Sequence, residues 1–365
     1  MAKRAICIEF GPFIIKICEV QKKKKQVVEV CRAVCLQTPT SCVENGYVSL
    51  TDELVSEIRN VLHSWGQVTP DLYVSLQADS ILYRTRKKNT ISDKEKFIQE
   101  QEQFFADRGA AYKIYIFENQ QDSLVDIIGV PLNIFNCYID LALCLNATLK
   151  GVVDSQYALR HNLCKKGANI FIDITEEKIM ASIGQQQHIA VIKNIPHSIF
   201  PAMFTIKKYS NEDLDMVQAL ELLRQISEDT GYGLDKSDVI RELNSFIEAL
   251  AQLIVTTAQD LRVAADMECD TIIISGFVAD MPYLFKRLKQ IIQYPVCNYK
   301  SVDVFSLHAD TTFDMANTFA SCVSSFNPNI NLLTPSILNT EHYNKYKRIE
   351  NNSSRSLLQK FFHYF

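Results

Sequence analysis

Two stretches of the sequence, about 164 residues apart, repeat the same pattern of apolar runs and turns. In each stretch an apolar run ends at an acidic residue, a tight turn follows, and two further apolar runs flank a polar tip. The first stretch covers residues 6–34 and contains Glu9, and the second covers 170–193 and contains Asp173. Short apolar runs separated by turns predict a strand followed by a β-hairpin. Two such units predict a duplicated α/β fold that places one acid from each half at a shared cleft.

The composition is that of an ordinary globular protein. The 365 residues are enough for two domains, 47% of them are apolar and 22% are charged. The net charge of −4 gives no reason to expect nucleic-acid binding. We expect no signal peptide, because Glu9 interrupts the first apolar run, and no membrane span, because no 18 apolar residues are consecutive. The eleven cysteines contain no Cys-x-x-Cys pair, so we expect buried free thiols in a reducing cytosol and no metal site.

The chain divides into three parts by pattern. We expect a first lobe at residues 1–165 with a small inserted α/β subdomain at 88–150, and a second lobe at 166–326. A tail of different composition follows at 327–365. Expected local features are a helix capped by Thr51, a charged helix capped by Ser92, a helix capped by Asp154 or Ser155, a loop around 196–201, helices at 211–228 and 237–266, and a last helix at 310–325 that returns to the first lobe.

Three turns contain residues suited to binding a nucleotide. A phosphate cradle needs converging backbone N–H groups, which glycine, serine and threonine turns supply, and magnesium needs carboxylate oxygens. The turns span residues 9–16, 173–178 and 275–278. Their candidate nucleotide-binding residues are Glu9, Gly11, Lys16, Asp173, Thr175, Ser275 and Gly276.

The order of these motifs resembles the PilM family of type IV pilus assembly proteins, which are relatives of the division protein FtsA. That family has an Asp-x-Gly-Ser-Ser-x-x-Lys-x-x-Glu first loop, an Asp-x-Gly second loop and a Ser-Gly-Gly third loop. The matching positions are Gly11, Lys16, Glu19, Asp173, Ser275 and Gly276. The resemblance covers residues 5–326. It implies an actin-like, two-lobed fold, which is a duplicated ribonuclease-H-like fold with a small inserted subdomain.

The loops depart from the family pattern at Pro12, Phe13, Thr175, Glu176, Glu177 and Phe277. Pro12 has no N–H to donate. Phe13 replaces a small hydroxyl residue and is expected to fill the space of a phosphate. The two glutamates bring like charge to the phosphate position, and Phe277 replaces a glycine on which adenine would lie. We therefore expect a degenerate site that binds ATP and Mg²⁺ weakly or not at all, with an active actin-like ATPase as an alternative.

The tail contains a second recognisable motif. Ile330, Asn331, Leu332, Leu333 and Pro335 resemble the Ile-Asn-Leu-Leu-Pro peptide at the cytoplasmic N-terminus of PilN, the membrane partner of PilM, with Thr334 inserted before the proline. In that family the peptide lies between the first lobe and the inserted subdomain. A tethered copy reaches a millimolar effective concentration. Three placements stay open: this chain's own groove, the groove of a neighbouring chain, or simple packing on the domain surface.

The last residues form a basic, apolar segment. Its apolar face would contain Leu357, Leu358, Phe361, Phe362 and Phe365. The segment resembles the membrane-targeting tail of FtsA, and basic residues contribute about 1 kcal/mol each near an anionic membrane. It could equally precede a membrane span in a PilM–PilN fusion, or pack back on the protein.

The resemblance implies a scaffold of the inner-membrane platform of a type IV pilus, competence or type II secretion system. Its expected partners are a PilN-like membrane protein, the motor ATPase complex and further copies of the chain. Its expected location is the cytoplasmic face of the membrane. The alternative within the same fold is an FtsA-like, membrane-tethered division filament.

Overall fold

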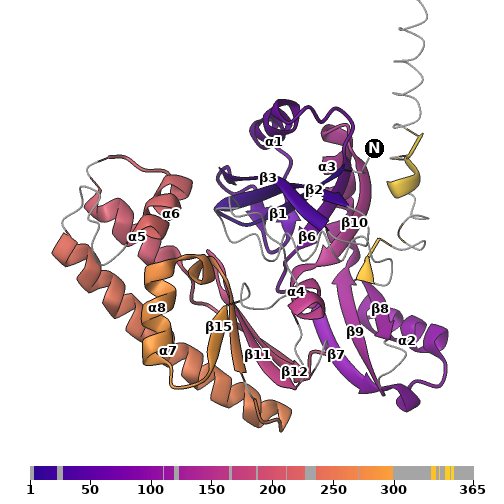
Figure 1. Ribbon diagram of the computed structural model, residues 1–365. Helices are drawn as coiled ribbons and strands as arrows, with labels where there is room; N and C mark the ends of the chain where they lie inside the picture. The colour runs from indigo at the N-terminus through magenta and orange to yellow at the C-terminus, as the bar shows by residue number, and fades with distance from the viewer. Residues whose placement is uncertain are drawn as a thin grey trace, which may run out of the picture.

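Two five-stranded sheets with equivalent strand orders organise the structure (Figure 1). The first has the order β3-β2-β1-β6-β10, and the second has the order β13-β12-β11-β14-β15. The computed structural model describes residues 4–22, 28–109, 111–118, 123–163, 167–185, 188–210, 212–226, 236–269, 271–298, 330–333, 337, 342–345 and 347–348. The predicted duplication is therefore confirmed at the level of sheet topology.

The first sheet contains the first sequence repeat. Its strands β1, β2 and β3 are antiparallel neighbours, whereas β6 and β10 run parallel to β1. Its elements are β1 (Arg4–Phe10), β2 (Ile14–Lys22), β3 (Val28–Gln37), the short pair β4 (Val43–Glu44) and β5 (Tyr47–Val48), α1 (Asp52–Ser64), β6 (Asp71–Leu76), α3 (Leu132–Cys144) and β10 (Thr148–Asp154). Thr51 caps α1, as predicted, because its side chain accepts a hydrogen bond from the amide of Leu54.

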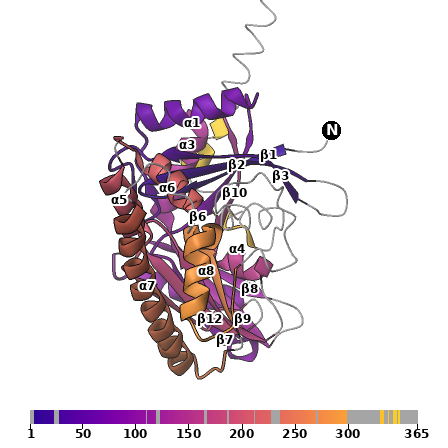
Figure 2. The same cartoon turned by 60° about the vertical axis from the view of Figure 1, so that its left-hand side comes forward.

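The second sheet contains the second repeat in the same arrangement. Its elements are β11 (Ala168–Ile174), β12 (Ile179–Gln185), β13 (Val191–Ile195), α5 (Phe200–Tyr209), α6 (Met216–Gln225), α7 (Lys236–Ala265), β14 (Thr271–Gly276), the 3-10 helix η3 (Phe277–Asp280), α8 (Pro282–Ile291) and β15 (Val296–Asn298). Figure 2 shows α7 and α8 side by side along the outside of this sheet. The loop expected around 196–201 ends earlier, because α5 begins at Phe200 and proline is tolerated in the first turn of a helix. The helix expected at 211–228 is shorter, since Asp215 caps it in a capping box.

A small three-stranded sheet with the order β7-β9-β8 lies beside the first lobe. Its elements are β7 (Leu82–Lys87), the 3-10 helix η2 (Lys88–Thr90), α2 (Lys94–Ala106), β8 (Tyr112–Glu118) and β9 (Leu124–Pro131). The predicted insert at 88–150 is thus placed too late at both ends. Its first strand begins at Leu82, while α3 and β10 belong to the first lobe because β10 pairs with β6. The charged helix α2 is capped by Asp93, not by Ser92.

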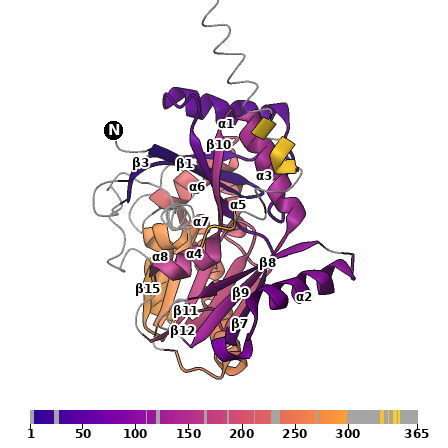
Figure 3. The same ribbon diagram turned by 90° about the vertical axis from the view of Figure 1, so that its right-hand side faces the viewer.

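Helix α4 (Ser155–Leu163) joins the two lobes and lies between them in Figures 1 and 3. Asp154 begins it by accepting a hydrogen bond from the amide of Tyr157 at 2.7 Å. Arg160 is 1% exposed and donates to the carbonyl oxygens of His188 and Asn169, so it fixes α4 to the second lobe. The helix expected at 310–325 lies outside the described residues, as do Pro335 and residues 357–365.

Three expectations about composition can be compared with the described part of the chain. Cys7, Cys18, Cys35 and Cys42 are buried, while Cys31 and Cys144 are exposed. No helix within the described ranges has both the length and the apolar character that a membrane crossing requires. The same residues contain no group of three or more histidine, cysteine or acidic side chains arranged to hold a metal ion.

Candidate functional site

The acid of the first repeat, Glu9, lies near the end of β1 and is 3% exposed. Its Oε1 atom accepts a hydrogen bond from Nζ of Lys16 at 2.9 Å, and its Oε2 atom accepts one from the hydroxyl of Ser75 at 2.8 Å. The sheet register places both donors, because Glu9 pairs with Lys16 on β2 and with Ser75 on β6. A buried carboxylate needs such partners, since losing its hydration without them costs several kcal/mol.

The acid of the second repeat, Asp173, is fully buried at the equivalent place on β11. Its Oδ1 atom accepts a hydrogen bond from the hydroxyl of Ser275 at 2.9 Å, and its Oδ2 atom accepts one from Nε2 of Gln156 at 2.8 Å. Ser275 lies on the parallel neighbour β14, as Ser75 does on β6. At the position of Lys16, however, the second repeat has Met180. Each acid therefore accepts a hydrogen bond from a serine, but Lys16 also donates to Glu9 whereas Gln156 donates to Asp173.

The turns of the two repeats contact each other directly. A Cβ atom added to Gly11 would lie 1.7 Å from Oε1 of Glu176, so that carboxylate occupies the space directly beside the first turn. Within the described chain, Oε1 has no hydrogen-bond partner. The neighbouring Glu177 is exposed, so only one of the two glutamates predicted to disturb the site points into it.

Burial dominates the titration of Glu176. It raises the pKa of Glu176 from 4.5 to about 7, and the nearby ammonium of Lys16 offsets part of that rise. Cys35 lies in the same environment, where burial raises its pKa to about 12. The site is therefore buried, and the Lys16 ammonium lies near the carboxylates of both Glu9 and Glu176.

The hydroxyl of Thr175 makes hydrogen bonds within its own turn. It donates to the carbonyl oxygen of Lys178 at 2.9 Å and accepts from the amides of Glu177 and Lys178. Two amides of the second turn are therefore satisfied locally. We expected Phe13 to fill the phosphate space. Instead the side chain beside Gly11 is that of Glu176, and the Phe13 ring packs on Phe200 with centroids 4.7 Å apart.

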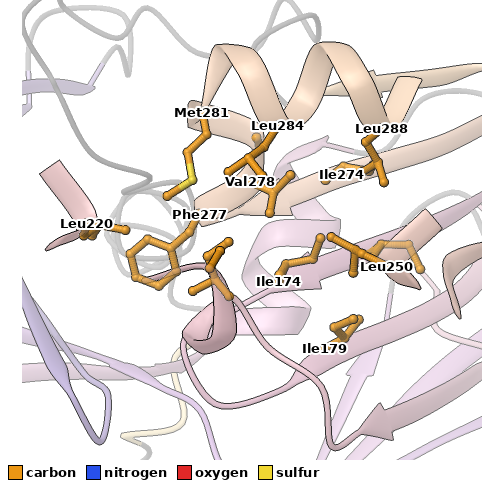
Figure 4. Packing of buried hydrophobic residues seen from close by; sticks show 14 of the residues in the cluster. Ile174, Ile179, Leu220, Leu250, Ile274, Phe277, Val278, Met281, Leu284 and Leu288 are labelled. Carbon is orange, nitrogen blue, oxygen red and sulfur yellow. The ribbon is translucent and has the colours of Figure 1, made fainter. Parts of the chain in front are cut away.

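The third turn is closed by packing. Gly276 has φ = +80°, and a Cβ there would lie 2.1 Å from the carbonyl oxygen of Ile174, so only glycine fits. The next residue, Phe277, is 2% exposed, and Figure 4 shows its ring beside Leu220 and below Met281 in the core of the second lobe. The Nζ atom of Lys16 lies 4.6 Å from the centroid of this ring. The ring thus packs its apolar face against the lysine.

A second site lies at the edge of the first sheet, where residues 330–333 run beside β10. The amide of Leu332 donates to the carbonyl oxygen of Val152 at 2.8 Å, and its carbonyl oxygen accepts a hydrogen bond from the hydroxyl of Tyr115 at 2.7 Å. Since Tyr115 lies on β8, the segment contacts both the first lobe and the inserted sheet. We call the surface formed by residues 150–152 and Tyr115 the edge site.

Asn331 fixes the position of the segment in the edge site. Its Oδ1 atom accepts from the amides of Val152 at 3.1 Å and Leu333 at 2.9 Å, while its Nδ2 atom donates to the carbonyl oxygen of Lys150 at 3.0 Å. Gly151 allows this approach, because a Cβ there would lie 2.7 Å from the Tyr73 ring and 3.1 Å from Nδ2 of Asn331. The Asn331 side chain therefore makes hydrogen bonds to the β10 backbone of the kind that a neighbouring strand would make.

The apolar side chains of the segment enter the core of the first lobe. Ile330, Leu332 and Leu333 are 3%, 0% and 8% exposed and belong to the hydrophobic cluster of that lobe. Figures 1 and 3 show the yellow C-terminal pieces on the side of β10 and α3. Further along, His342 contacts Asp140 of α3 with 2.9 Å between Nε2 and Oδ1. The structure places the segment on its own chain, packed against β10 and Tyr115.

Several residues of these two sites escaped the sequence analysis. Ser75 and Gln156 bind the two acids, while Tyr115 and Gly151 form the edge site. Ser75 had a usable signal, because it ends a strand just as Ser275 does in the other repeat. Gln156, Tyr115 and Gly151 had none, since their partners lie 17, 217 and 180 positions away in the sequence.

No family model matches this chain, and no curated protein matches it in sequence. Solved structures do match. A "PilM-PilN type IV pilus biogenesis complex" superposes with a TM-score of 0.64 at 13% identity, covering 88% of this chain and 97% of that one. The ethanolamine utilization protein EutJ from Carboxydothermus hydrogenoformans superposes with a TM-score of 0.54 at 10% identity, covering 88% and 90% of the two chains. The fold is actin-like, and the similarity to PilM is confirmed at the level of fold.

Proposed function

We propose that this chain is an actin-like scaffold of the inner-membrane platform of a type IV pilus or type II secretion system. It acts by binding an extended Ile-Asn-Leu-Leu peptide at the edge site, and it does not turn over ATP. The observation on which the proposal depends is the seating of residues 330–333 between β10 and Tyr115. The similarity of fold to the PilM–PilN complex supports the choice of system.

The chemistry of the edge site suits one kind of ligand. The exposed edge of a sheet offers backbone groups to an added strand, and pockets for alternate side chains give the specificity. Here β10 offers the backbone groups of Lys150 and Val152, and the first lobe buries the leucine at position 332 completely. The partner in this proposal is a PilN-like membrane protein with the same peptide chemistry. It places the chain at the cytoplasmic face of the membrane, in contact with the motor ATPase complex.

The cleft does not suit ATP. Beside Gly11 the phosphate would meet the buried carboxylate of Glu176, and Pro12 offers no amide to it. Phe277 is packed in the core, so its ring is fixed where the family has a glycine. We therefore propose that ATP and Mg²⁺ are not cofactors and that the fold is retained for its binding surfaces.

A peptide-exchange experiment on the full chain tests the binding role. A fluorescent peptide with the sequence of residues 327–340 competes with the chain's own segment, which the tether favours by an effective concentration in the millimolar range. With the native chain we expect the peptide to show only a small rise in fluorescence polarisation, because the internal segment occupies the edge site. The double variant Leu332→Ser/Leu333→Ser weakens the internal segment, so we expect binding at least tenfold tighter.

Two matched controls define the site. Adding Gly151→Val to the double variant should abolish binding, because the new side chain would collide with Tyr73 and with the peptide asparagine. A peptide carrying Ala in place of Asn331 should bind at least tenfold more weakly, because its three hydrogen bonds are lost. Equal binding by the Gly151→Val chain, in a form that melts like its parent, would reject the edge site as the peptide site.

A further inference from the structure

The segment that occupies the edge site has a second contact with the first lobe, on helix α3. Residues 342–345 are helical, and His342 contacts Asp140 of α3. We propose that the surface of α3 at Asp140, which we call the α3 site, is the second half of the peptide-binding surface. The ligand is then an extended Ile-Asn-Leu-Leu stretch followed by a helical turn that buries an aromatic side chain. This inference rests on the proposed binding role of the edge site and extends it.

Two side chains of the continuation are buried as deeply as those in the edge site. Ile337 is 1% exposed and Tyr343 is 5% exposed, and both belong to the hydrophobic cluster of the first lobe. The members of that cluster from α3 include Ile134, Phe135 and Tyr138. Figure 3 shows yellow C-terminal pieces beside α3. The first lobe therefore buries apolar side chains of the segment at two separate places.

Polar groups surround the buried tyrosine of the α3 site. Nε2 of His342 lies 2.9 Å from Oδ1 of Asp140, and these two side chains are 35% and 45% exposed. Nζ of Lys347 lies 5.5 Å from the centroid of the Tyr343 ring. A buried aromatic side chain inside a partly exposed polar rim is the arrangement found at the hot spots of protein interfaces. The α3 site thus has the character of a recognition surface.

Different elements form the two halves of the surface. The edge site lies on β10 and β8, whereas Asp140 lies on α3. Leu333 at the edge site and His342 at the α3 site are nine positions apart in the sequence. A peptide that ends before Ile337 therefore reaches only the edge site, and a peptide that extends beyond Tyr343 reaches both. Joining two contacts in one peptide strengthens binding, because the second contact forms at a high effective concentration.

The chain's own segment shows the chemistry of the partner that fits this surface. The partner is a peptide at least as long as residues 330–343, with the asparagine and leucines of the edge site followed by a helical turn. That turn carries an aromatic side chain for the first-lobe core and, next to it, a side chain that hydrogen-bonds to Asp140. A partner with only the Ile-Asn-Leu-Leu motif fills half of the surface.

Two fluorescent peptides of different length test the inference on the full chain. The short peptide covers residues 327–336, and the long peptide covers residues 327–348. The chain carries the triple change Leu332→Ser/Leu333→Ser/Tyr343→Ser, which weakens its own segment at both sites. We expect the long peptide to bind about tenfold more tightly than the short one in fluorescence polarisation, because only the long peptide adds the aromatic anchor.

Single changes locate the gain in affinity. Asp140→Ala in the triple variant should weaken the long peptide about threefold, by removing one hydrogen bond, and should leave the short peptide unchanged. A long peptide with Tyr343→Ala should bind no more tightly than the short one. A long peptide with Lys345→Ala is the matched control, because that side chain is exposed, and it should bind like its parent.

The possible outcomes separate this inference from the proposed function. Equal binding of the short and long peptides by the triple variant would overturn the α3 site and leave the edge site intact. Failure of both peptides to bind would reject the edge site and the α3 site together. If the triple variant does not fold, hydrogen exchange replaces the binding assay. The amide of Leu332, which donates to Val152, should then exchange faster in Tyr343→Ala than in Lys345→Ala, and equal rates would overturn the inference.

Discussion

The two repeats share a backbone plan but stabilise their buried acids differently. In the first, Glu9 pairs with Lys16 inside one hairpin, so the compensation is local and charged. In the second, the equivalent strand position holds the apolar Met180, and Asp173 receives a neutral hydrogen bond from Gln156 of the joining helix α4. Lys16 of the first repeat is thus close both to its own acid, Glu9, and to Glu176 of the second repeat. This asymmetry couples the repeats, because Lys16 of the first repeat also affects the charge of Glu176 in the second.

Making the first repeat like the second should produce the largest effect. Lys16→Met leaves Glu9 buried without its charged partner, which typically costs 3–5 kcal/mol. We therefore expect a loss of about that size in the free energy of unfolding, measured by urea denaturation of the full chain.

The double variant Glu9→Gln/Lys16→Met separates charge from packing. It removes both charges, so it should recover more than half of the lost stability, since the neutral amide still accepts a hydrogen bond from Ser75. Met180→Leu in the other repeat is the packing control and should cost less than about 1.5 kcal/mol. If the double variant is no more stable than Lys16→Met, the lysine acts by packing rather than by charge.

The sequence predicted the fold well because the fold depends on local patterns. The apolar runs around Glu9 and Asp173 and the turns after them repeat at equal spacing, and hairpins are set by such local signals. The motif at residues 330–333 was also visible, because four consecutive residues match the Ile-Asn-Leu-Leu start of a known peptide. The limits of the insert were less visible, since a strand such as β7 looks the same whichever sheet it joins.

The sites were harder to predict because they depend on contacts between distant residues. From the sequence, both Glu176 and Glu177 were expected to bring negative charge to the phosphate position. In the structure Glu176 is buried against Gly11, whereas Glu177 is exposed. Only the position of each in the turn decides this, and a turn of four residues has no periodicity to show it. The same holds for Tyr115, whose hydroxyl meets a carbonyl oxygen 217 positions away.

The pH dependence of stability should distinguish the turns of the two repeats. When the two hairpins are aligned on Glu9 and Asp173, Glu176 takes the position of Pro12, and of these two residues only Glu176 has an ionisable side chain. Burial raises the pKa of Glu176 from 4.5 to about 7, so the folded protein holds a proton that the unfolded chain has released between these values. The group therefore lowers the free energy of unfolding as pH rises from about 4.5 to 7, by a total on the order of 3 kcal/mol.

Glu176→Gln removes this titration while keeping the shape. We expect the variant to be more stable than the native chain at pH 8, with the difference shrinking steadily towards pH 5. Asp154, whose pKa burial raises to about 6, contributes the same sign in both proteins and cancels in the comparison. Urea midpoints at several pH values measure the difference. A constant difference from pH 5 to pH 8 would show that Glu176 does not titrate in this range.

The two serines give the most direct comparison of the repeats and the smallest expected effects. Ser75→Ala and Ser275→Ala each remove one hydroxyl donor from a buried carboxylate, which costs about 1–3 kcal/mol. We expect Ser275→Ala to cost more, because Glu9 retains its ion pair with Lys16 while Asp173 retains a hydrogen bond from the neutral amide of Gln156. Urea denaturation measures both losses. Equal losses of unfolding free energy would mean that Lys16 stabilises Glu9 no more than Gln156 stabilises Asp173. A larger loss for Ser75→Ala would mean that Lys16 interacts mainly with Glu176.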